Sequence, residues 1–276
     1  MTQPAGPPGT LLCADIGNSR TTLGLLRGGE VLDTWRVATD ERRTADEWAV
    51  LVRGLLAESS AAVSSGAVEE PERWLEGVAV CATVPAVLHE WREMLERRFA
   101  GLTAVIVEPG VRTGVPVHMD NPREVGADRI VNALAAATYH PGPAIVVDFG
   151  TATTFDVVDA RGAYVGGAIA PGIEISLDAL GRRGAQLRQV EVARPRTVIA
   201  RNTVEALQSG IVFGFASQVE GIVARMVDEL GLEPDDVSVV ATGGLAPVVV
   251  DEIDGLTAHS PWLTLLGLEL VFARNR

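Results

Sequence analysis

The sequence contains no lysine, because all 23 of its basic residues are arginine. This absence excludes mechanisms that need an ammonium group. A Walker-A loop places a lysine on the terminal phosphates, the protein-kinase fold uses a lysine on a strand, and pyridoxal-type chemistry forms a Schiff base with lysine. Any phosphate-binding role of this chain must therefore rest on backbone amides, hydroxyl groups, arginine and a metal ion.

Cysteines and long apolar runs are also scarce. Cys13 and Cys81, the two cysteines, lie in apolar strand-like runs, which is typical of buried small residues in a reducing compartment. No apolar stretch approaches the roughly 20 residues that span a bilayer. Residues 1–9 lack the basic and apolar regions of a signal peptide. The sequence therefore predicts a cytoplasmic protein without a membrane partner.

The 36 acidic residues outnumber the 23 basic ones, which gives a formal net charge of −13. Duplex nucleic acid needs clustered cations, so a nucleic-acid partner is not expected. The length of 276 residues, 47% of them hydrophobic, is natural for two folded domains. We expect a disordered tail at residues 1–10, an N-terminal lobe at 11–118 and a C-terminal lobe at 119–276.

A short phrase occurs twice, at Cys13–Thr22 and Val146–Phe155, and the copies align without a gap at an offset of 133 residues. Each copy reads as strand, tight Asp-x-Gly hairpin, strand, turn and strand. One Asp-x-Gly is weak evidence, because ordinary hairpin turns contain it. Two copies with hydroxyl residues suggest two lobes that hold a phosphate chain and a hydrated cation, with Asp15 and Asp148 beside them.

The rest of the pattern alternates helices with buried strands. Thr44 and Glu47 form a capping box in front of an apolar helical stripe. Further helices are expected at 85–99, 127–139, 202–230 and 262–272 and strands at 30–37, 77–84, 103–107, 144–148 and 237–241, with loops at 59–67 and 166–172.

Three further motifs admit two interpretations each. Gly126–Arg129 begins a helix, where Asp128 either satisfies the helix dipole or accepts a proton from a substrate hydroxyl, with Arg129 holding a substrate carboxylate. Thr242–Gly244 permits close approach of a nucleotide but also serves a plain turn. Asn202 and Thr203 with Glu205 fit a helix cap. The four histidines show no paired metal spacing.

In their order along the chain, the following motifs together resemble those of type III pantothenate kinases: Asp15–Ser19, Gly126–Arg129, Asp148–Thr154, Gly166–Gly167 with Pro171–Gly172, Asn202–Thr203 with Ser209–Gly210, and Thr242–Gly244. The resemblance covers nearly the whole chain from Leu11. Such enzymes belong to the actin, sugar-kinase and Hsp70-like ATPase superfamily. The resemblance therefore implies an α/β fold of two ribonuclease-H-like lobes, a duplicated βββαβαβα pattern with the active site in the cleft between them. It also implies a homodimer that contributes substrate-site residues across its interface.

The resemblance implies a role for each site residue. Asp15, Ile16, Gly17, Asn18, Ser19, Arg20, Thr21 and Thr22 would form the first phosphate loop, with Asp15 near Mg²⁺ through water. Thr151 would contact an ATP phosphate, and Asp148 would bind a monovalent cation, K⁺ or NH₄⁺. Gly126, Ala127, Asp128 and Arg129 would frame pantothenate, with Asp128 as the general base, and Thr203 would contact the same substrate.

The implied activity is ATP-dependent phosphorylation of pantothenate to 4′-phosphopantothenate, the first step of coenzyme A synthesis. Asp128 must then stay ionised, so a cation such as Arg129 is expected beside it. The sequence departs from the family at Ala200–Arg201, where many members have Gly-Lys, and at Leu187–Gln189, which lacks a common proline.

Three alternatives remain. The first is a non-enzymatic transcriptional accessory factor of the Bvg accessory factor type, which keeps this fold. Intact Asp15, Asp128 and Asp148 weigh against a pure scaffold. The second is a kinase of another small hydroxy acid, with the same ATP loops but different surroundings at Gly126–Arg129. The third, a ribonuclease-H-type nuclease, rests on fold analogy alone.

Overall fold

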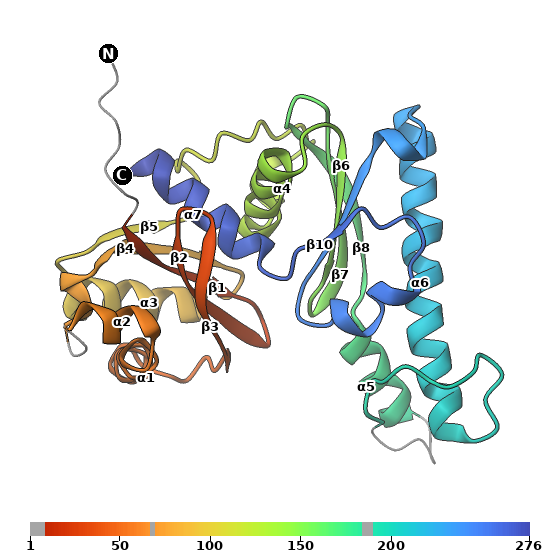
Figure 1. The fold of residues 1–276 in the computed structure, drawn as a ribbon, viewed down its shortest axis with the longest axis horizontal. Helices are drawn as coiled ribbons and strands as arrows, with labels where there is room; N and C mark the ends of the chain where they lie inside the picture. The colour runs from red at the N-terminus through yellow and green to blue at the C-terminus, as the bar shows by residue number, and fades with distance from the viewer. Residues whose placement is uncertain (1–8, 67–69, 184–189) are drawn as a thin grey trace. The chain divides into compact units, whose positions relative to one another are not determined.

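Two mixed five-stranded sheets, one in each of two units, organise the chain (Figure 1). The computed structural model describes residues 9–66, 70–183 and 190–276. Unit 1 holds the described residues up to Gly114, together with Arg123–Ala135 and Thr264–Arg276. Unit 2 holds Val115–Pro122 and Ala136–Leu263. The chain passes between the units at four points, and one of them, between Ala135 and Ala136, falls inside helix α4 (Ala127–Tyr139).

The sheet of unit 1 has the order β3-β2-β1-β4-β5. Its strands are β1 (Thr10–Ile16), β2 (Arg20–Arg27), β3 (Glu30–Ala38), β4 (Leu75–Ala82) and β5 (Thr103–Ile106). The first three strands are antiparallel, and β4 and β5 run parallel to β1. Helices α1 (Ala45–Ala57), α2 (Ser60–Ser65) and α3 (Pro85–Arg98) connect them, and α1 begins at the predicted capping box of Thr44 and Glu47.

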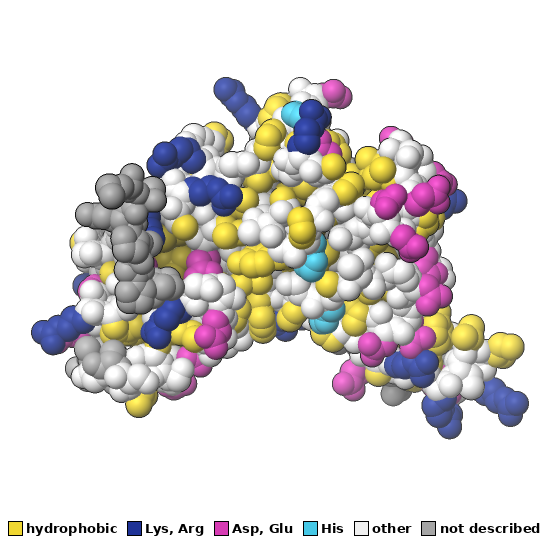
Figure 2. Space-filling view, turned by 45° about the horizontal axis from the view of Figure 1, so that its top comes forward, with side chains coloured by type: hydrophobic (Ala, Val, Ile, Leu, Met, Phe, Trp, Pro, Cys, Tyr) yellow, Lys and Arg dark blue, Asp and Glu magenta, His cyan; other side chains and the backbone are white. Residues whose placement is uncertain are grey.

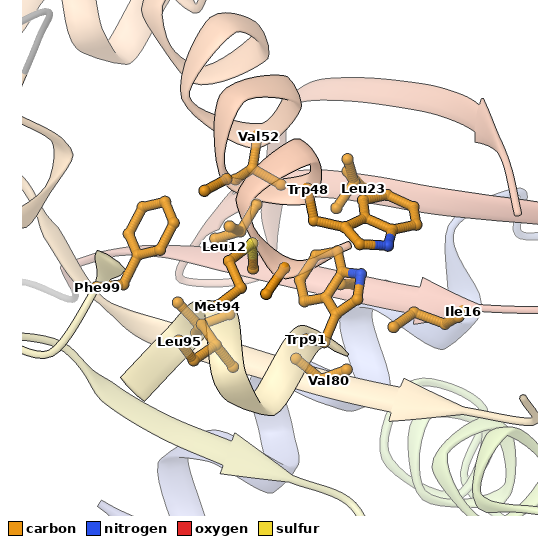
Figure 3. Packing of buried hydrophobic residues seen from close by; sticks show 14 of the residues in the cluster. Leu12, Ile16, Leu23, Trp48, Val52, Val80, Trp91, Met94, Leu95 and Phe99 are labelled. Carbon is orange, nitrogen blue, oxygen red and sulfur yellow. The ribbon is translucent and has the colours of Figure 1, made fainter. Parts of the chain in front are cut away.

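The two faces of this sheet have different partners because side chains alternate along a strand. Leu12, Ala14 and Ile16 of β1 are buried in one cluster with residues of α1 and α3. Within that cluster the rings of Trp48 and Trp91 lie with centroids 5.5 Å apart (Figure 3).

Helix α7 (Leu263–Asn275) packs against the opposite face of the same sheet. A Cβ on Gly77 would lie 2.4 Å from Phe272, and a Cβ on Gly24 would lie 2.6 Å from Leu265. The last helix of the chain therefore completes the first unit, and glycine in the sheet makes its close approach possible.

Unit 2 repeats the same topology. Its strand order is β10-β9-β6-β7-β8, formed by β6 (Ala144–Phe149), β7 (Ala152–Val158), β8 (Tyr164–Pro171), β9 (Ser238–Thr242) and β10 (Ala258–His259). Helices α5 (Ile173–Arg183) and α6 (Thr203–Leu230) complete it. Buried residues of β6, β7, β9 and α6 form one apolar cluster.

The internal repeat is confirmed by the register of the two sheets, with one correction. Asp15 pairs with Thr22, whereas Asp148 pairs with Thr154, so the first hairpin turn is one residue longer than the second. The ungapped alignment, which matched Thr22 to Phe155, is therefore wrong along the second strand. The β-bulges at Leu25/Leu26 and Val157/Val158 occupy equivalent places and support the corrected match.

Two predicted loops are regular elements instead. Residues 59–67 contain helix α2, because the buried Ser59 hydroxyl accepts a hydrogen bond from the Ala62 amide (3.0 Å) and caps it. Residues 166–172 largely belong to β8, which lies at the sheet edge, where glycine and a terminal proline are tolerated. The short strand β10 and helix α5 were not predicted.

Helix α6 corrects the expectation that no apolar stretch approaches a membrane span. Its 28 residues include an 18-residue window of mean hydropathy 1.3, which suffices by length and composition alone. The core helix of a soluble protein passes the same test, and Ile211, Phe215 and Val219 of α6 are buried in the unit 2 cluster. Of the remaining predictions, Leu187–Gln189 and the tail up to residue 8 lie outside the described residues.

Candidate active site

The turn between β1 and β2 is a closed loop anchored to the end of β3. The Gly17 amide donates to the Arg20 carbonyl (3.1 Å) and the Thr39 amide donates to the Ser19 carbonyl (3.2 Å). The Thr39 hydroxyl donates to the Gly17 carbonyl (2.8 Å) and lies 2.9 Å from the Thr21 hydroxyl. These bonds fix the loop backbone while residues 18–20 stay exposed. The predicted phosphate loop is therefore preorganised and open to a ligand.

Asp15 stands at the start of this loop, and its pKa is raised to about 7. Removal of the carboxylate from water is the largest cause, and the negative charge of Asp128 is the second. The Cys81 thiol donates a hydrogen bond to Asp15 Oδ1 (3.4 Å), which lowers the pKa in part. Sequence analysis treated Cys81 only as a buried small residue and missed this contact, which depends on the parallel pairing of Asp15 with Cys81.

Asp128 lies in the first turn of α4, where Oδ1 accepts a hydrogen bond from the Arg129 amide (2.9 Å). A Cβ on Gly126 would lie 2.5 Å from Asp128 Oδ1, so glycine gives the carboxylate its room. Burial raises the pKa of Asp128, while the Arg129 amide and the Arg129 charge lower it. The cation expected beside Asp128 is thus present, although burial outweighs it. A carboxyl group with a raised pKa is a better proton acceptor near neutral pH.

Close packing against α7 fixes the position of α4. A Cβ on Gly267 would lie 2.3 Å from the Val131 carbonyl oxygen, so the two helices meet backbone to backbone. Next to this contact the buried Thr264 hydroxyl donates to Asn132 Oδ1 (2.8 Å). Asp128 and Asp15 are therefore brought together by tertiary packing of segments more than a hundred residues apart in the sequence.

In the second hairpin, in unit 2, Asp148 lies next to the loop that contains Gly243. The Gly150 amide donates to the Ala152 carbonyl (3.0 Å) across the turn. Gly243 has a φ of 94° and a Cβ there would lie 2.4 Å from Asp148 Oδ1. A Cβ on Gly172 would likewise lie 2.2 Å from the Thr151 carbonyl oxygen. The glycines at positions 172 and 243 thus let two loops close on the turn that carries Asp148 and Thr151.

Thr203 is the first residue of α6 and is exposed. Asn202 caps this helix, since its side chain accepts a hydrogen bond from the Glu205 amide (2.9 Å) and donates one to the Glu205 carboxylate (2.7 Å). Arg196 adds an ion pair to Glu205. The cap forms with Ala200–Arg201 in front of it, so this departure from the family pattern leaves the local helix start intact.

A cation at either aspartate would have few carboxylate, histidine or cysteine ligands among the described residues. Within residues 9–66, 70–183 and 190–276, no group of three or more His, Cys, Asp or Glu side chains is placed to hold a metal ion. Mg²⁺ commonly takes one or two carboxylates and completes its shell with water and substrate phosphates. A single half-buried carboxylate beside the predicted phosphate loop would therefore fit a magnesium ion that arrives with a nucleotide.

Comparison with known proteins assigns the chain to a family. Residues 11–225 match the family model described as type III pantothenate kinase. The chain belongs to the type III pantothenate kinase family. A protein of Nocardioides sp. (strain ATCC BAA-499 / JS614) with that name is 70% identical, with 96% of this chain and 99% of that one covered. A protein of Streptomyces griseus subsp. griseus with the same name is 60% identical, with 96% and 98% covered.

Among solved structures, component A of the (R)-2-hydroxyglutaryl-CoA dehydratase of Acidaminococcus fermentans has a TM-score of 0.51. It is 14% identical, and the match covers 97% of this chain and 99% of that chain. At this identity the likeness concerns the fold alone. The predicted α/β fold of two duplicated lobes is confirmed, and the family assignment identifies the chain as a kinase.

The raised pKa of Asp15 predicts a pH-dependent cost to stability. With a pKa of 3.8 unfolded and about 7 folded, Asp15 binds more protons in the folded state, so its contribution falls as pH rises through that window. In the absence of metal, the unfolding free energy of Asp15→Asn minus that of the wild type should increase by about 2 to 3 kcal/mol from pH 5 to pH 8. Denaturant unfolding at both pH values measures it.

Asp235→Asn is the matched control, because Asp235 is exposed on the 3₁₀ helix Pro234–Asp236. Its unfolding free energy should differ from that of the wild type by the same amount at pH 5 and at pH 8. A pH-independent difference between Asp15→Asn and the wild type would contradict the electrostatic account of Asp15.

Proposed function

We propose that this kinase transfers the γ-phosphoryl group of ATP to the hydroxyl group of pantothenate and yields 4′-phosphopantothenate, the first step of coenzyme A synthesis. The observation that carries the proposal is the pairing of Asp128 with Asp15 in unit 1. One carboxylate stands at a preorganised anion loop, and the other has a raised pKa and lies on a rigid helix. Family membership supports the same reaction.

Asp128 is the general base in this proposal. Phosphoryl transfer requires in-line positioning and charge neutralisation more than covalent help from the protein. Asp128 would accept the proton of the pantothenate hydroxyl as that oxygen attacks. Gly126, Ala127 and Arg129 would frame the substrate, with the Arg129 guanidinium as a two-pronged donor to the pantothenate carboxylate. Thr203, exposed at the start of α6, would contact pantothenate as well.

Each hairpin would contribute nucleotide contacts within its own unit. Asp15–Thr22 would bind ATP phosphates in unit 1, and Thr151 would contact a phosphate in unit 2. Bound Mg²⁺ supplies neutralisation of phosphate charge, and Asp15 would hold it through water. Asp148 would hold K⁺ or NH₄⁺, because its carboxylate lies in the hairpin that carries Thr151 and close to the Gly243 loop.

Two alternative functions are supported less well. A transcriptional accessory factor on this fold has no use for two carboxylates with raised pKa values in one unit, which cost stability. A kinase of another small hydroxy acid would keep the nucleotide loops, and only a substrate test separates it from the proposed activity.

We place the reaction in the cytoplasm.

We also propose that the kinase is a homodimer, on the basis of exposed apolar side chains in unit 2. Val198, Ile199 and Val204 are 64%, 86% and 50% exposed around the start of α6. Figure 2 shows hydrophobic side chains on the surface at the end of unit 2 that carries α5 and the start of α6. Apolar surface of this kind is typical of protein–protein interfaces.

A homodimer should have a molar mass of twice 29.1 kDa, which light scattering measures. Ile199→Glu should shift the kinase toward the monomer at low micromolar concentration, because it places a charge in the interface. Val50→Glu is the control, since Val50 is 75% exposed on α1 in unit 1 and lies outside the proposed interface. Equal masses for both variants at all concentrations would refute this location of the interface.

The proposed reaction is tested by ADP release with pantothenate, ATP and Mg²⁺, first in K⁺ and then in Na⁺ alone. We expect turnover that requires pantothenate and that falls at least tenfold in Na⁺. Turnover with other hydroxy acids but not with pantothenate would favour the second alternative. ATP binding without any turnover would also refute the proposed substrate, and an absence of ATP binding would favour the accessory-factor alternative.

Asp128→Asn should lower kcat about 100-fold or more, since a positioned general base contributes about 10² to 10⁴ in rate. The unfolding free energy should not decrease, because the amide removes a buried charge. The ADP-release assay and denaturant unfolding measure the two effects. Asp235→Asn again serves as the control and should leave kcat unchanged. Wild-type turnover in Asp128→Asn would refute the assigned base.

A further inference from the structure

The position of the proposed base is not fixed by its own hydrogen bonds. Asp128 Oδ1 accepts from the amide of Arg129, which is the next residue of the same helix (2.9 Å). Such a local bond orients the carboxylate relative to α4 but not relative to β1, which carries Asp15. A misplacement of about 1 Å can slow a reaction about 10²-fold. A contact between α4 and the rest of unit 1 must therefore place the base.

Asn132 is the polar residue in the buried stretch of α4. It follows Asp128 by four residues, so both side chains lie on one side of the helix, about one turn or 6 Å apart. Asn132 is 1% exposed, and a buried amide costs free energy unless it is hydrogen-bonded. The partners of Asn132 therefore determine where this part of α4 can lie. Its neighbours in the stretch are buried and apolar: Val131, Ala133, Leu134, Ala135 and Ala136.

One partner of Asn132 lies on α7. The hydroxyl of Thr264, in the first turn of that helix, donates to Asn132 Oδ1 (2.8 Å), and Thr264 is buried as well. Gly267 lies one turn further along the same side of α7, against the Val131 backbone. Apolar packing lacks direction, and a glycine surface offers no ridge that would stop the helices from sliding. A hydrogen bond has a narrow range of length and angle, so this bond sets the register of α4 on α7.

Helix α7 is in turn anchored to the sheet of unit 1. Glu269 accepts a hydrogen bond from the Gly29 amide (2.8 Å) in the turn between β2 and β3. Leu265 lies over Gly24 of β2, where a Cβ would be 2.6 Å from the leucine side chain. Thr264 therefore joins the helix of the proposed base to the sheet that carries the predicted phosphate loop.

We propose that Thr264 and Asn132 are positioning residues, whose hydrogen bond places the Asp128 carboxylate relative to the phosphate loop. This inference rests on the proposed function. Neither side chain touches a reacting atom or exchanges a proton with the substrate in this role. Both act through Asp128, so their effect on turnover should require the base.

Thr264→Val removes the hydroxyl and keeps the shape of the side chain, so Asn132 loses this donor. In the ADP-release assay kcat should fall about tenfold or more, with a change of less than about twofold in KM for ATP, because the phosphate loop lies on β1 and β2. Thr264→Ser keeps the donor and should stay within about threefold of the wild-type kcat. Thr264→Cys offers a weaker donor and should be intermediate, and it replaces Thr264→Val in the test if that variant does not fold.

A double-mutant cycle separates positioning from a structural role. In the Asp128→Asn background, which lacks the base, Thr264→Val should lower the residual kcat by less than about twofold. A general loss of rigidity or of folded protein would instead lower turnover by the same factor in both backgrounds. Equal factors, or a wild-type kcat in Thr264→Val, would overturn the proposal.

Thr10→Val is the matched control. Thr10 is 2% exposed in unit 1, and its hydroxyl accepts a hydrogen bond from Arg27 of β2 (2.6 Å). The same exchange of hydroxyl for methyl should lower the unfolding free energy and leave kcat unchanged. If Thr10→Val and Thr264→Val lower kcat equally, the positioning role is also wrong, because any lost buried hydroxyl would then have the same effect.

The two proposals fail in different ways. If the wild type does not phosphorylate pantothenate, or if Asp128→Asn retains wild-type turnover, the proposed function or its base fails, and the positioning role fails with it. If the wild type is active, Asp128→Asn is not, and Thr264→Val turns over normally, only the positioning role fails.

Discussion

Repulsion between Asp15 and Asp128 sets the central physical problem of unit 1. Each carboxylate is removed from water, and the charge of Asp128 adds to the cost of ionising Asp15. Two such groups stay together only if the surrounding structure over-determines their positions. The pairing of β1 with β4, which places the Cys81 thiol on Asp15, and the contact of α4 with α7 provide this constraint. A divalent cation bound at the proposed site would relieve this repulsion.

The contact of α4 with α7 explains why the first unit is completed by the end of the chain. Glycines at positions 24, 77 and 267 remove the side chains that would keep α7 away from the sheet and from α4. Since α4 carries Asp128 in its first turn, any displacement of α7 moves the proposed base. The glycines are therefore part of the site, although none of them is proposed to touch a ligand.

Local signals in the sequence predicted local structure well. The capping box of Thr44 and the cap of Asn202 fix helix starts through bonds within three residues, and both are present. The hairpin repeat predicted two equivalent sheets because it records strand, turn and strand in order. The loop of residues 59–67 was predicted wrongly because a buried serine cap has the same composition as an exposed serine-rich loop. Contacts such as Cys81 with Asp15 arise only from strand pairing across 66 residues, which periodicity does not encode.

The two hairpins also show how one motif supports two proposed chemistries. Asp15 is paired with Cys81 and shares its surroundings with Asp128, whereas Asp148 occupies the equivalent position paired with Thr242. The negative charge of Asp128 acts on Asp15, so a divalent cation would gain more from this surrounding than a singly charged one. Asp148 is paired instead with a hydroxyl residue, and its Oδ1 lies close to Gly243. The parallel pairing of each strand therefore gives the two aspartates different neighbours, and this difference is one basis for the different ions proposed at Asp15 and Asp148.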